Sequence, residues 1–264
     1  MKPTVEFVKN ITLQAGQILQ SFVGHEMGVK HKGRTDLITK ADNASEDFLI
    51  QSIRDKFPDH AINTEESGDL DGNHDHQWFI DPLDGTLNYA HGLPFYCASV
   101  AYAYKGELTL GVVYDPTRDE CFYAERGQGA LLNGKPIKVS NFQDLIECML
   151  FTGFPNNKWG TPTDNTDNFL RFSLLSQTVR RLGSAALAIA YVACGRLDGF
   201  WEVEINQWDV AAGGLIAREA GAVVTDVYGD PDFLKEPVTM VGANPTIHKQ
   251  MLTVLTKVRS EYSH

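Results

Sequence analysis

A short apolar run that stops at two carboxylates limits how this chain can fold. Trp78–Ile80 is aromatic and β-branched, as expected for a buried strand, and Pro82 cannot donate a hydrogen bond to a continuing sheet. We therefore expect the strand to end near Asp81. Asp84 is placed to cap a helix that begins at Gly85, and the free N–H groups at a helix start can bind an anion.

Two carboxylates beside an anion site repel the anion unless a cation lies between them. Asp81 and Asp84 offer hard oxygen ligands, which suit Mg²⁺. The motif alone is equally typical of an ordinary strand-to-helix turn with a capping aspartate, because a short motif is only a hypothesis. We take this segment as the candidate active centre.

Composition indicates a folded chain with little attraction to polyanions. The chain has 264 residues, 43% of them hydrophobic, which is enough for one large core or two closely joined subdomains. Its formal net charge of −11 disfavours nonspecific contact with nucleic acid or anionic membranes, although a local basic patch stays open. The cysteines are scattered, the start of the chain lacks a secretory pattern, and no apolar run reaches the ~20 residues of a membrane span. We expect a soluble, cytoplasmic protein with reduced thiols.

The first half of the chain predicts two helices followed by an antiparallel meander. Apolar residues recur with helical spacing over 5–23, and a second amphipathic helix over 43–57 would have Asp42 as its N-cap. The glycine-rich segment 126–130 is a weak nucleotide signal that we interpret as a hairpin turn. Three strand-like runs separated by turn residues form the meander: 97–104, 108–114 and 120–125.

Several polar residues of this half could serve in a functional site or could simply be solvent-exposed residues of turns and loops. Lys32 lies in a predicted turn, where it could reach a phosphate but is more typical of a solvated charge. Glu65 and the glutamate after it follow a strand-like run, and by themselves they are typical of a wet loop. His74 and His76 lie in a polar loop over 69–77, where a bound metal would need a third ligand.

The second half alternates strand and helix signals, which favours α/β layering. A strand over 179–182 leads into a helix from Gly183 to Ala193, and a strand over 199–203 precedes a helix that starts near Asp209. Asp209 alone would be interpreted as the N-cap of that helix. The remaining predicted segments are a surface loop over 156–168, strands over 222–226 and 238–243, and a terminal helix over 246–258.

We place a boundary between two subdomains near Phe142. Residues 1–141 would form an N-terminal α+β subdomain that carries most of the candidate metal ligands. Residues 142–264 would form a C-terminal α/β subdomain that carries Asp209 and the residues of a substrate wall.

Taken in order, the polar motifs resemble those of the inositol monophosphatase family over nearly the whole chain. The matching segments are Lys32, Asp42, Glu65-Glu66-Ser67, Asp81-Pro82-Leu83-Asp84-Gly85-Thr86-Leu87-Asn88 and Trp208-Asp209. An upstream E-E followed by D-P-L-D-G-T and W-D is typical of the wider magnesium-dependent, lithium-sensitive phosphatase superfamily. The resemblance implies an α/β fold, a layered α-β-α-β-α sandwich with a largely antiparallel N-terminal sheet and a mixed C-terminal sheet, commonly assembled as a homodimer.

The resemblance also implies roles for individual residues. Thr86, oriented by Asp42, would position and help deprotonate the attacking water, while the N–H groups of Gly85 and Thr86 cradle the phosphate. Lys32 would add positive charge nearby. Clustered metals can supply charge neutralisation and a deprotonated water for phosphate monoester hydrolysis. Two or three Mg²⁺ ions would be held by Glu65, Asp81, the Leu83 carbonyl, Asp84 and Asp209, with Thr86 completing the first site.

The implied substrate is inositol 1-phosphate or a similar small polyol phosphate. Glu202 falls where family members that act on inositol phosphate place a glutamate that contacts a sugar hydroxyl. The other residues of that wall would be Asp84, Ser184, Ala185 and Asp209. Asn206 stands where animal members have a histidine, and Thr64 stands where a glycine often precedes the two glutamates.

Two alternatives remain beside this substrate. The same chemistry could act on histidinol phosphate, fructose bisphosphate or a 3′-phosphonucleotide. The chain could instead be a regulatory scaffold that contacts RNA or the transcription machinery, as some bacterial relatives are thought to do, although its charge does not indicate this. A pseudoenzyme usually loses a ligand, and here all the motif carboxylates are present.

Overall fold

The computed structural model describes residues 1–24, 28, 30–31, 37–155 and 164–262. Lys32 and most of the predicted loop over 156–168 lie outside these residues. The helices are α1 (Val5–Phe22), α2 (Lys40–Lys56), α3 (Thr86–Ala90), a 3-10 turn (Leu145–Glu147), α4 (Thr166–Leu175), α5 (Ala185–Ala193), α6 (Gln207–Glu219) and α7 (Pro245–Tyr262).

The first large sheet contains the central motif. Its strands are β3 (His60–Thr64), β4 (Gly68–Leu70), β5 (Asn73–Asp84), β6 (Cys97–Tyr104), β7 (Glu107–Asp115), β8 (Glu120–Glu125), β9 (Ala130–Leu132) and β10 (Lys135–Pro136). Their order across the sheet is β10-β9-β8-β7-β6-β5-β3-β4, and every neighbouring pair is antiparallel except β3 with β5. A separate two-stranded sheet pairs β1 (Lys30–His31) antiparallel with β2 (Leu37–Ile38).

The second sheet is smaller and mixed. Its strands are β11 (Met149–Thr152), β12 (Thr178–Arg180), β13 (Gly199–Glu202), β14 (Val223–Thr225) and β15 (Met240–Ala243). The order is β12-β11-β13-β15-β14, with the first three strands parallel and the last two pairs antiparallel. The predicted combination of a largely antiparallel sheet and a mixed sheet is confirmed.

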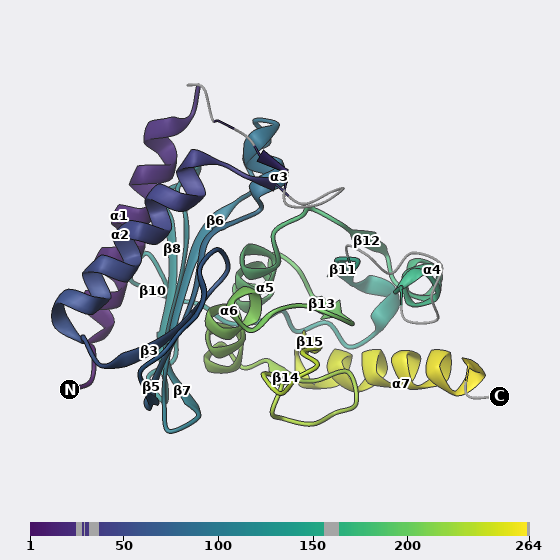
Figure 1. The fold of residues 1–264 in the computed structure, drawn as a ribbon. Helices are drawn as coiled ribbons and strands as arrows, with labels where there is room; N and C mark the ends of the chain where they lie inside the picture. Colours follow the sequence, from purple (N-terminus) through teal and green to yellow (C-terminus); the bar gives the residue numbers. More distant parts are fainter. Residues whose placement is uncertain (25–27, 29, 32–36, 156–163, 263–264) are drawn as a thin grey trace.

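Helices and sheets alternate in five layers (Figure 1). The pair α1 and α2 covers one face of the first sheet, α5 and α6 lie between the two sheets, and α4 and α7 lie beyond the second sheet. Separate apolar clusters fill the spaces between these layers. The α/β sandwich expected from the sequence is therefore confirmed, while the division at 141/142 stays a prediction.

The central helix α6 packs unusually close to the first sheet. At Gly111 in β7, an added Cβ would lie 2.8 Å from the carbonyl oxygen of Ala212 in α6, closer than real Cβ atoms approach a neighbouring atom. Glycine therefore lets the helix backbone rest directly on the strand. This contact fixes the height of α6, which carries Asp209 at its start, above the first sheet.

The structure corrects several predicted boundaries. The strand does not end near Asp81, because β5 continues to Asp84 through a shift in its pairing with β6, and this irregularity accommodates Pro82. The polar loop expected over 69–77 contains β4 and the start of β5 instead. The loop expected over 156–168 is too long, since α4 already begins at Thr166. None of the helices in the described ranges combines the length and apolar composition of a bilayer-spanning helix.

Candidate active site

The two aspartates of the central motif lie in the irregular end of β5. Asp81 and Asp84 are 1% and 8% exposed. Asp81 accepts a hydrogen bond from the N–H of Leu83 at 3.0 Å, which folds the segment back on itself. This turn directs the Leu83 carbonyl oxygen toward the hydroxyl of Thr86, at 3.0 Å.

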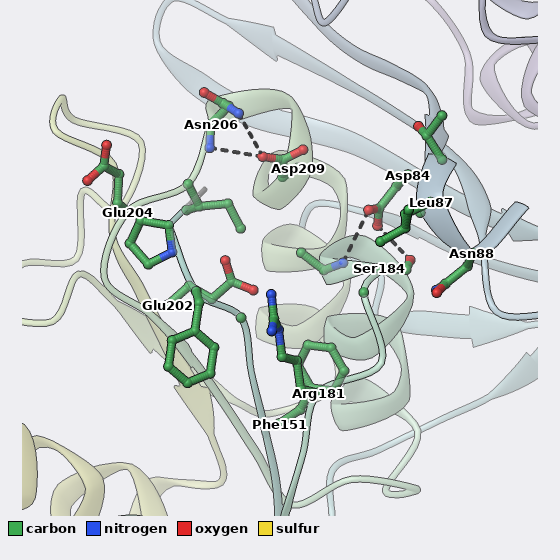
Figure 2. A pocket seen from close by; sticks show the side chains of 18 of the residues that line it. Asp84, Leu87, Asn88, Phe151, Arg181, Ser184, Glu202, Glu204, Asn206 and Asp209 are labelled. Carbon is green, nitrogen blue, oxygen red and sulfur yellow. Dashed lines mark hydrogen bonds between the residues drawn. The ribbon is translucent and has the colours of Figure 1, made fainter. Parts of the chain in front are cut away.

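Asp84 caps a helix, but not the expected one. The N-cap of α3 is Gly85, which has a left-handed backbone conformation (φ 99°) and no side chain to cap the helix. Asp84 instead accepts hydrogen bonds at the start of α5, one hundred residues downstream (Figure 2). Its carboxylate lies 2.7 Å from the Ser184 hydroxyl, 2.7 Å from the N–H of Ala186 and 3.2 Å from the N–H of Ala185. The carboxylate oxygens accept from N–H groups that have no partner within the helix, and the negative charge interacts favourably with the positive end of the helix dipole.

Thr86 and Asp42 lie together, as the resemblance implied. The Thr86 hydroxyl is 3.1 Å from Oδ1 of Asp42, which comes from α2. Asp42 is not the N-cap of that helix: Thr39 is, and Asp42 is the third helical residue, which bonds back to Thr39 in a capping box. Burial raises the pKa of Asp42, while its hydrogen bonds to Thr39 and Thr86 oppose this shift.

Asp209 occupies the same position in α6 as Asp42 does in α2. Asn206 is the N-cap, and Oδ2 of Asp209 accepts from its backbone N–H at 2.9 Å and from its side-chain amide at 3.1 Å (Figure 2). The expectation that Asp209 is itself the N-cap is therefore wrong. Burial, and then the charge of Asp84, raises the pKa of Asp209 from 3.8 to about 7.

Four carboxyl groups from distant segments lie within one another's electric fields. Burial raises the pKa of Asp81 well above its usual range, and the charges of Glu65, Asp84 and Asp209 raise it further. Two of these groups, Asp81 and Asp84, are buried, and carboxylates so close together need protons or cations to offset their charge. A set of oxygen donors with several negative charges fits Mg²⁺.

The protein's own donors occupy part of this ligand set. Asp84 accepts three hydrogen bonds from the start of α5 and one from the Cys97 thiol, and Asp209 accepts two from Asn206. Among the described residues, no three acidic, histidine or cysteine side chains are gathered into a complete metal site. A cation bound here would therefore share Asp84 and Asp209 with these protein donors.

A pocket of about 480 Å³ opens beside these carboxylates and contains the predicted substrate wall. Glu202, from the end of β13, faces this pocket, and burial and the charges of Asp209 and Asp84 raise its pKa well above the usual range. Gly153 leaves room for it, because a Cβ there would collide with the Glu202 carboxylate. The predicted pocket residues that line it are Asp84, Gly85, Thr86, Ser184, Ala185, Glu202 and Asp209.

The sequence analysis missed several polar residues of this pocket: Asn88, Arg181 and Glu204. The Arg181 side chain lies beside that of Glu202, and its positive charge partly offsets the rise in the Glu202 pKa (Figure 2). Asn88 donates from its side-chain amide to the carbonyl oxygens of Phe95, at 2.7 Å, and Leu182, at 2.5 Å. Asn88 ends the matched motif, and Arg181 comes shortly before Ser184. Their closeness in sequence to predicted site residues was therefore the only local indication that they line the pocket.

Other polar segments identified in the sequence lie away from this pocket. His76 lies near the start of β5, where its ring stacks on that of His60 with centroids 4.2 Å apart. The glycine-rich turn after β8 binds an anion from the protein itself: the N–H groups of Gly127 and Gly129 each lie 2.9 Å from the carboxylate of Glu219. The hairpin interpretation of this turn is thus supported. Glu65 lies in the turn between β3 and β4, and Lys32 lies outside the described residues.

Comparison with known proteins agrees with this arrangement. Residues 1–262 match the model of the inositol monophosphatase family. An inositol-1-monophosphatase from Synechocystis sp. is 42% identical, covering 95% of this chain and 88% of that protein. A protein named Nus factor SuhB from Pseudomonas aeruginosa is 40% identical, covering 97% of this chain and 96% of that protein. The solved structure of an inositol monophosphatase from Anabaena (Nostoc) sp. superposes with a TM-score of 0.86 at 41% identity, covering 96% of this chain and 95% of that one. The chain therefore belongs to the inositol monophosphatase family.

Proposed function

We propose that this protein is a Mg²⁺-dependent phosphomonoesterase that hydrolyses inositol 1-phosphate or a similar small polyol phosphate. One observation carries the proposal: buried and half-buried carboxylates from distant segments meet beside the Thr86–Asp42 pair at the edge of a polar pocket. Such a cluster of negative charge disfavours a phosphate ester by itself, so cations are needed to bind one there.

The residues proposed to hold two or three Mg²⁺ ions are Glu65, Asp81, the Leu83 carbonyl, Asp84 and Asp209. When bound, Mg²⁺ supplies positive charge for the phosphoryl oxygens and makes a nearby water more acidic. The protein contributes the fixed positions of these ligands, which come from β5, α6 and the turn after β3.

Thr86 and Asp42 would orient the attacking water. A threonine hydroxyl has one proton and two acceptor lone pairs. When that proton is donated to Asp42, 3.1 Å away, the oxygen lone pairs can accept from a water molecule and hold it for attack. The backbone N–H groups of Gly85 and Thr86 would bind the phosphate, and Lys32 would add positive charge.

The pocket wall would bind the polyol. A volume of about 480 Å³ lies in the usual range for small-molecule sites. Glu202 would contact a hydroxyl group of the substrate, and Ser184 and Ala185 would line the other side. We further propose that the protein acts in the cytoplasm as a homodimer.

Phosphate release by the purified protein tests this function. The panel is inositol 1-phosphate, histidinol phosphate, fructose bisphosphate and 3′-phosphoadenosine 5′-phosphate, each with Mg²⁺ and with a chelator. We expect release that depends on Mg²⁺ and is fastest on inositol 1-phosphate. Faster turnover of another substrate would overturn the pocket assignment alone, whereas no release from any substrate would overturn the enzymatic proposal.

A second role is suggested by the name Nus factor carried by a relative of 40% identity. We propose association with the transcription machinery as this second role, through a protein surface, since the net charge of −11 disfavours direct RNA contact. Co-purification with a transcription complex would test it. Association that persists in Asp209→Asn, without phosphate release, would separate the two roles, and no association in wild type would remove the second.

A further inference from the structure

One face of α2 carries buried polar side chains next to the candidate site. Ser45 and Glu46 come three and four residues after Asp42, so all three project from the same side of the helix. Each is at most 3% exposed. Polar groups buried this deeply need hydrogen-bond partners.

These partners lie in the segments that carry the candidate ligands. Ser45 donates its hydroxyl proton to the carbonyl oxygen of Pro82, at 3.0 Å, inside the D-P-L-D-G-T motif. Glu46 reaches the turn between β3 and β4, which contains Glu65. The helix therefore contacts both the central motif and the turn that supplies the upstream glutamate.

Glu46 holds this turn at both ends. Its Oε1 accepts from the hydroxyl of Thr64, where β3 ends. The same oxygen accepts from the N–H groups of Glu66 and Ser67, at 3.1 and 3.2 Å. Oε2 accepts from the Ser67 hydroxyl at 2.8 Å. Glu46 therefore accepts four hydrogen bonds from this one turn, three of them on Oε1.

The helix that carries Glu46 is itself fixed in the core. Leu49 and Ile53, one and two turns further along the same face, are fully buried between α1 and the first sheet. A carboxylate on such a helix can define a position more sharply than one on a loop. Its reach to the turn after β3 is therefore set by the packing of α2.

We propose that Glu46 is a positioning residue that fixes the turn after β3, so that Glu65 faces Asp81 and can bind Mg²⁺ with it. The inference rests on the proposed function, because Glu65 is a ligand only if this site binds a cation. Residues that hold metal ligands in place typically change metal affinity 10- to 100-fold when replaced.

Two replacements of Glu46 separate position from charge. In Glu46→Gln, the carbonyl oxygen can take the place of Oε1, and the Ser67 hydroxyl can turn to accept from the amide, so the turn is held without the charge. In Glu46→Asp, the charge remains but the side chain is one methylene shorter and cannot reach the same donors. Asp47→Asn is the matched control, since Asp47 is the next residue and is exposed.

Mg²⁺ binding measured by titration calorimetry is the main readout, because it does not depend on turnover. We expect Glu46→Asp to bind Mg²⁺ about tenfold more weakly, with faster hydrogen exchange at the amides of Glu66 and Ser67. Glu46→Gln and Asp47→Asn should bind Mg²⁺ as tightly as wild type. If Glu46→Asp does not fold, Ser67→Ala, which removes one of the bonds to Glu46, should weaken binding about threefold.

A double-mutant cycle tests whether Glu46 acts through Glu65. In a Glu65→Gln background, Glu46→Asp should cause no further loss of Mg²⁺ affinity. Unchanged Mg²⁺ affinity in Glu46→Asp, or a larger loss in Glu46→Gln than in Glu46→Asp, would overturn the proposal. If Glu65→Gln itself leaves Mg²⁺ affinity unchanged, Glu65 is not a ligand, and that part of the proposed function fails together with this inference.

Discussion

Replacing Asp209 by asparagine should stabilise the metal-free protein. Both hydrogen bonds from Asn206 end on Oδ2 of Asp209, so the carbonyl oxygen of an asparagine can accept both and keep the capping box of α6. The new amide N–H₂ group would replace Oδ1. The charges of Asp209 and Asp81 repel each other in wild type, and the neutral amide would remove this repulsion.

The size of this effect follows from the raised pKa of Asp209. The pKa is 3.8 without the fold and about 7 within it, so the folded state holds the proton more tightly than the unfolded state. Wild-type stability from this group is therefore highest below pH 4 and declines as the pH rises toward 7. A shift of this size corresponds to about 4 kcal/mol of unfolding free energy. Asp209 is only half-buried, and screening by water reduces the expected gain to about 2 kcal/mol.

Urea unfolding in EDTA measures the difference between variant and wild type. Asp209→Asn should be about 2 kcal/mol more stable at pH 8, and the gain should fall to roughly a third of that at pH 5, where wild type already holds most of the proton. Asp209→Ala, which loses both bonds from Asn206, should be about 1 kcal/mol less stable than Asp209→Asn.

Added Mg²⁺ should reverse the order of stability. Wild type should gain stability by binding the ion, whereas Asp209→Asn should gain less and should release no phosphate. A variant less stable than wild type in EDTA at pH 8 would refute the reasoning, because it would show that the carboxylate stabilises the metal-free fold. An equal gain at both pH values would refute its electrostatic cause.

Three further changes test other parts of the structure. Asp84→Asn should abolish phosphate release, and unlike Asp209→Asn it should leave an N–H of α5, such as that of Ala185, without an acceptor; in urea we expect it to be about 1 kcal/mol less stable than Asp209→Asn. Gly111→Ala should lower stability by about 1–3 kcal/mol, because its Cβ would press on Ala212 and displace α6, and thermal unfolding would show this as a lower Tm. The pKa of His60 is lowered to about 4, mainly by burial, so the stability that this group contributes is full above pH 6.5 and is lost as the pH falls to 4. Between these pH values the unfolding free energy of His60→Asn should therefore fall by about 2 kcal/mol less than that of wild type.

Each of these has a distinct contrary outcome. Asp84→Asn as stable as Asp209→Asn would show that capping of α5 contributes little. A wild-type Tm in Gly111→Ala would show that α6 can move away from β7 without loss. Parallel acid unfolding curves for wild type and His60→Asn would place the titrating group elsewhere.

Local sequence patterns predicted most of the elements, and the errors have specific causes. Strands such as 97–104 and helices such as 5–23 have periodic apolar residues, which locate them without knowledge of their neighbours. Asp42 and Asp209 were each assigned to the N-cap, whereas each is the third residue of its helix. Thr39-x-x-Asp42 and Asn206-x-x-Asp209 are capping-box patterns, so both pairs could have been identified from the sequence.

The site depends on contacts that no local pattern contains. The bond from Ser184 to Asp84 joins residues one hundred positions apart, and nothing near Asp84 indicates that α5 is its partner. The strand β11 was not predicted, because its four residues, from Met149 to Thr152, are too few for a periodic signal. The acidic motifs could be identified as a set only through the family resemblance, whereas their mutual distances required the fold.

The long separation between Asp84 and α5 bears on how the protein is made. During synthesis the first sheet can form while α5 and α6 are still unmade, so at that stage Asp84 has none of its three capping donors and Asp209 is missing. The pocket can therefore be completed only after the ribosome has released most of the second half. A nascent or truncated chain that ends before α6 would contain the whole central motif and still lack the assembled site, so the motif is made well before the site can form.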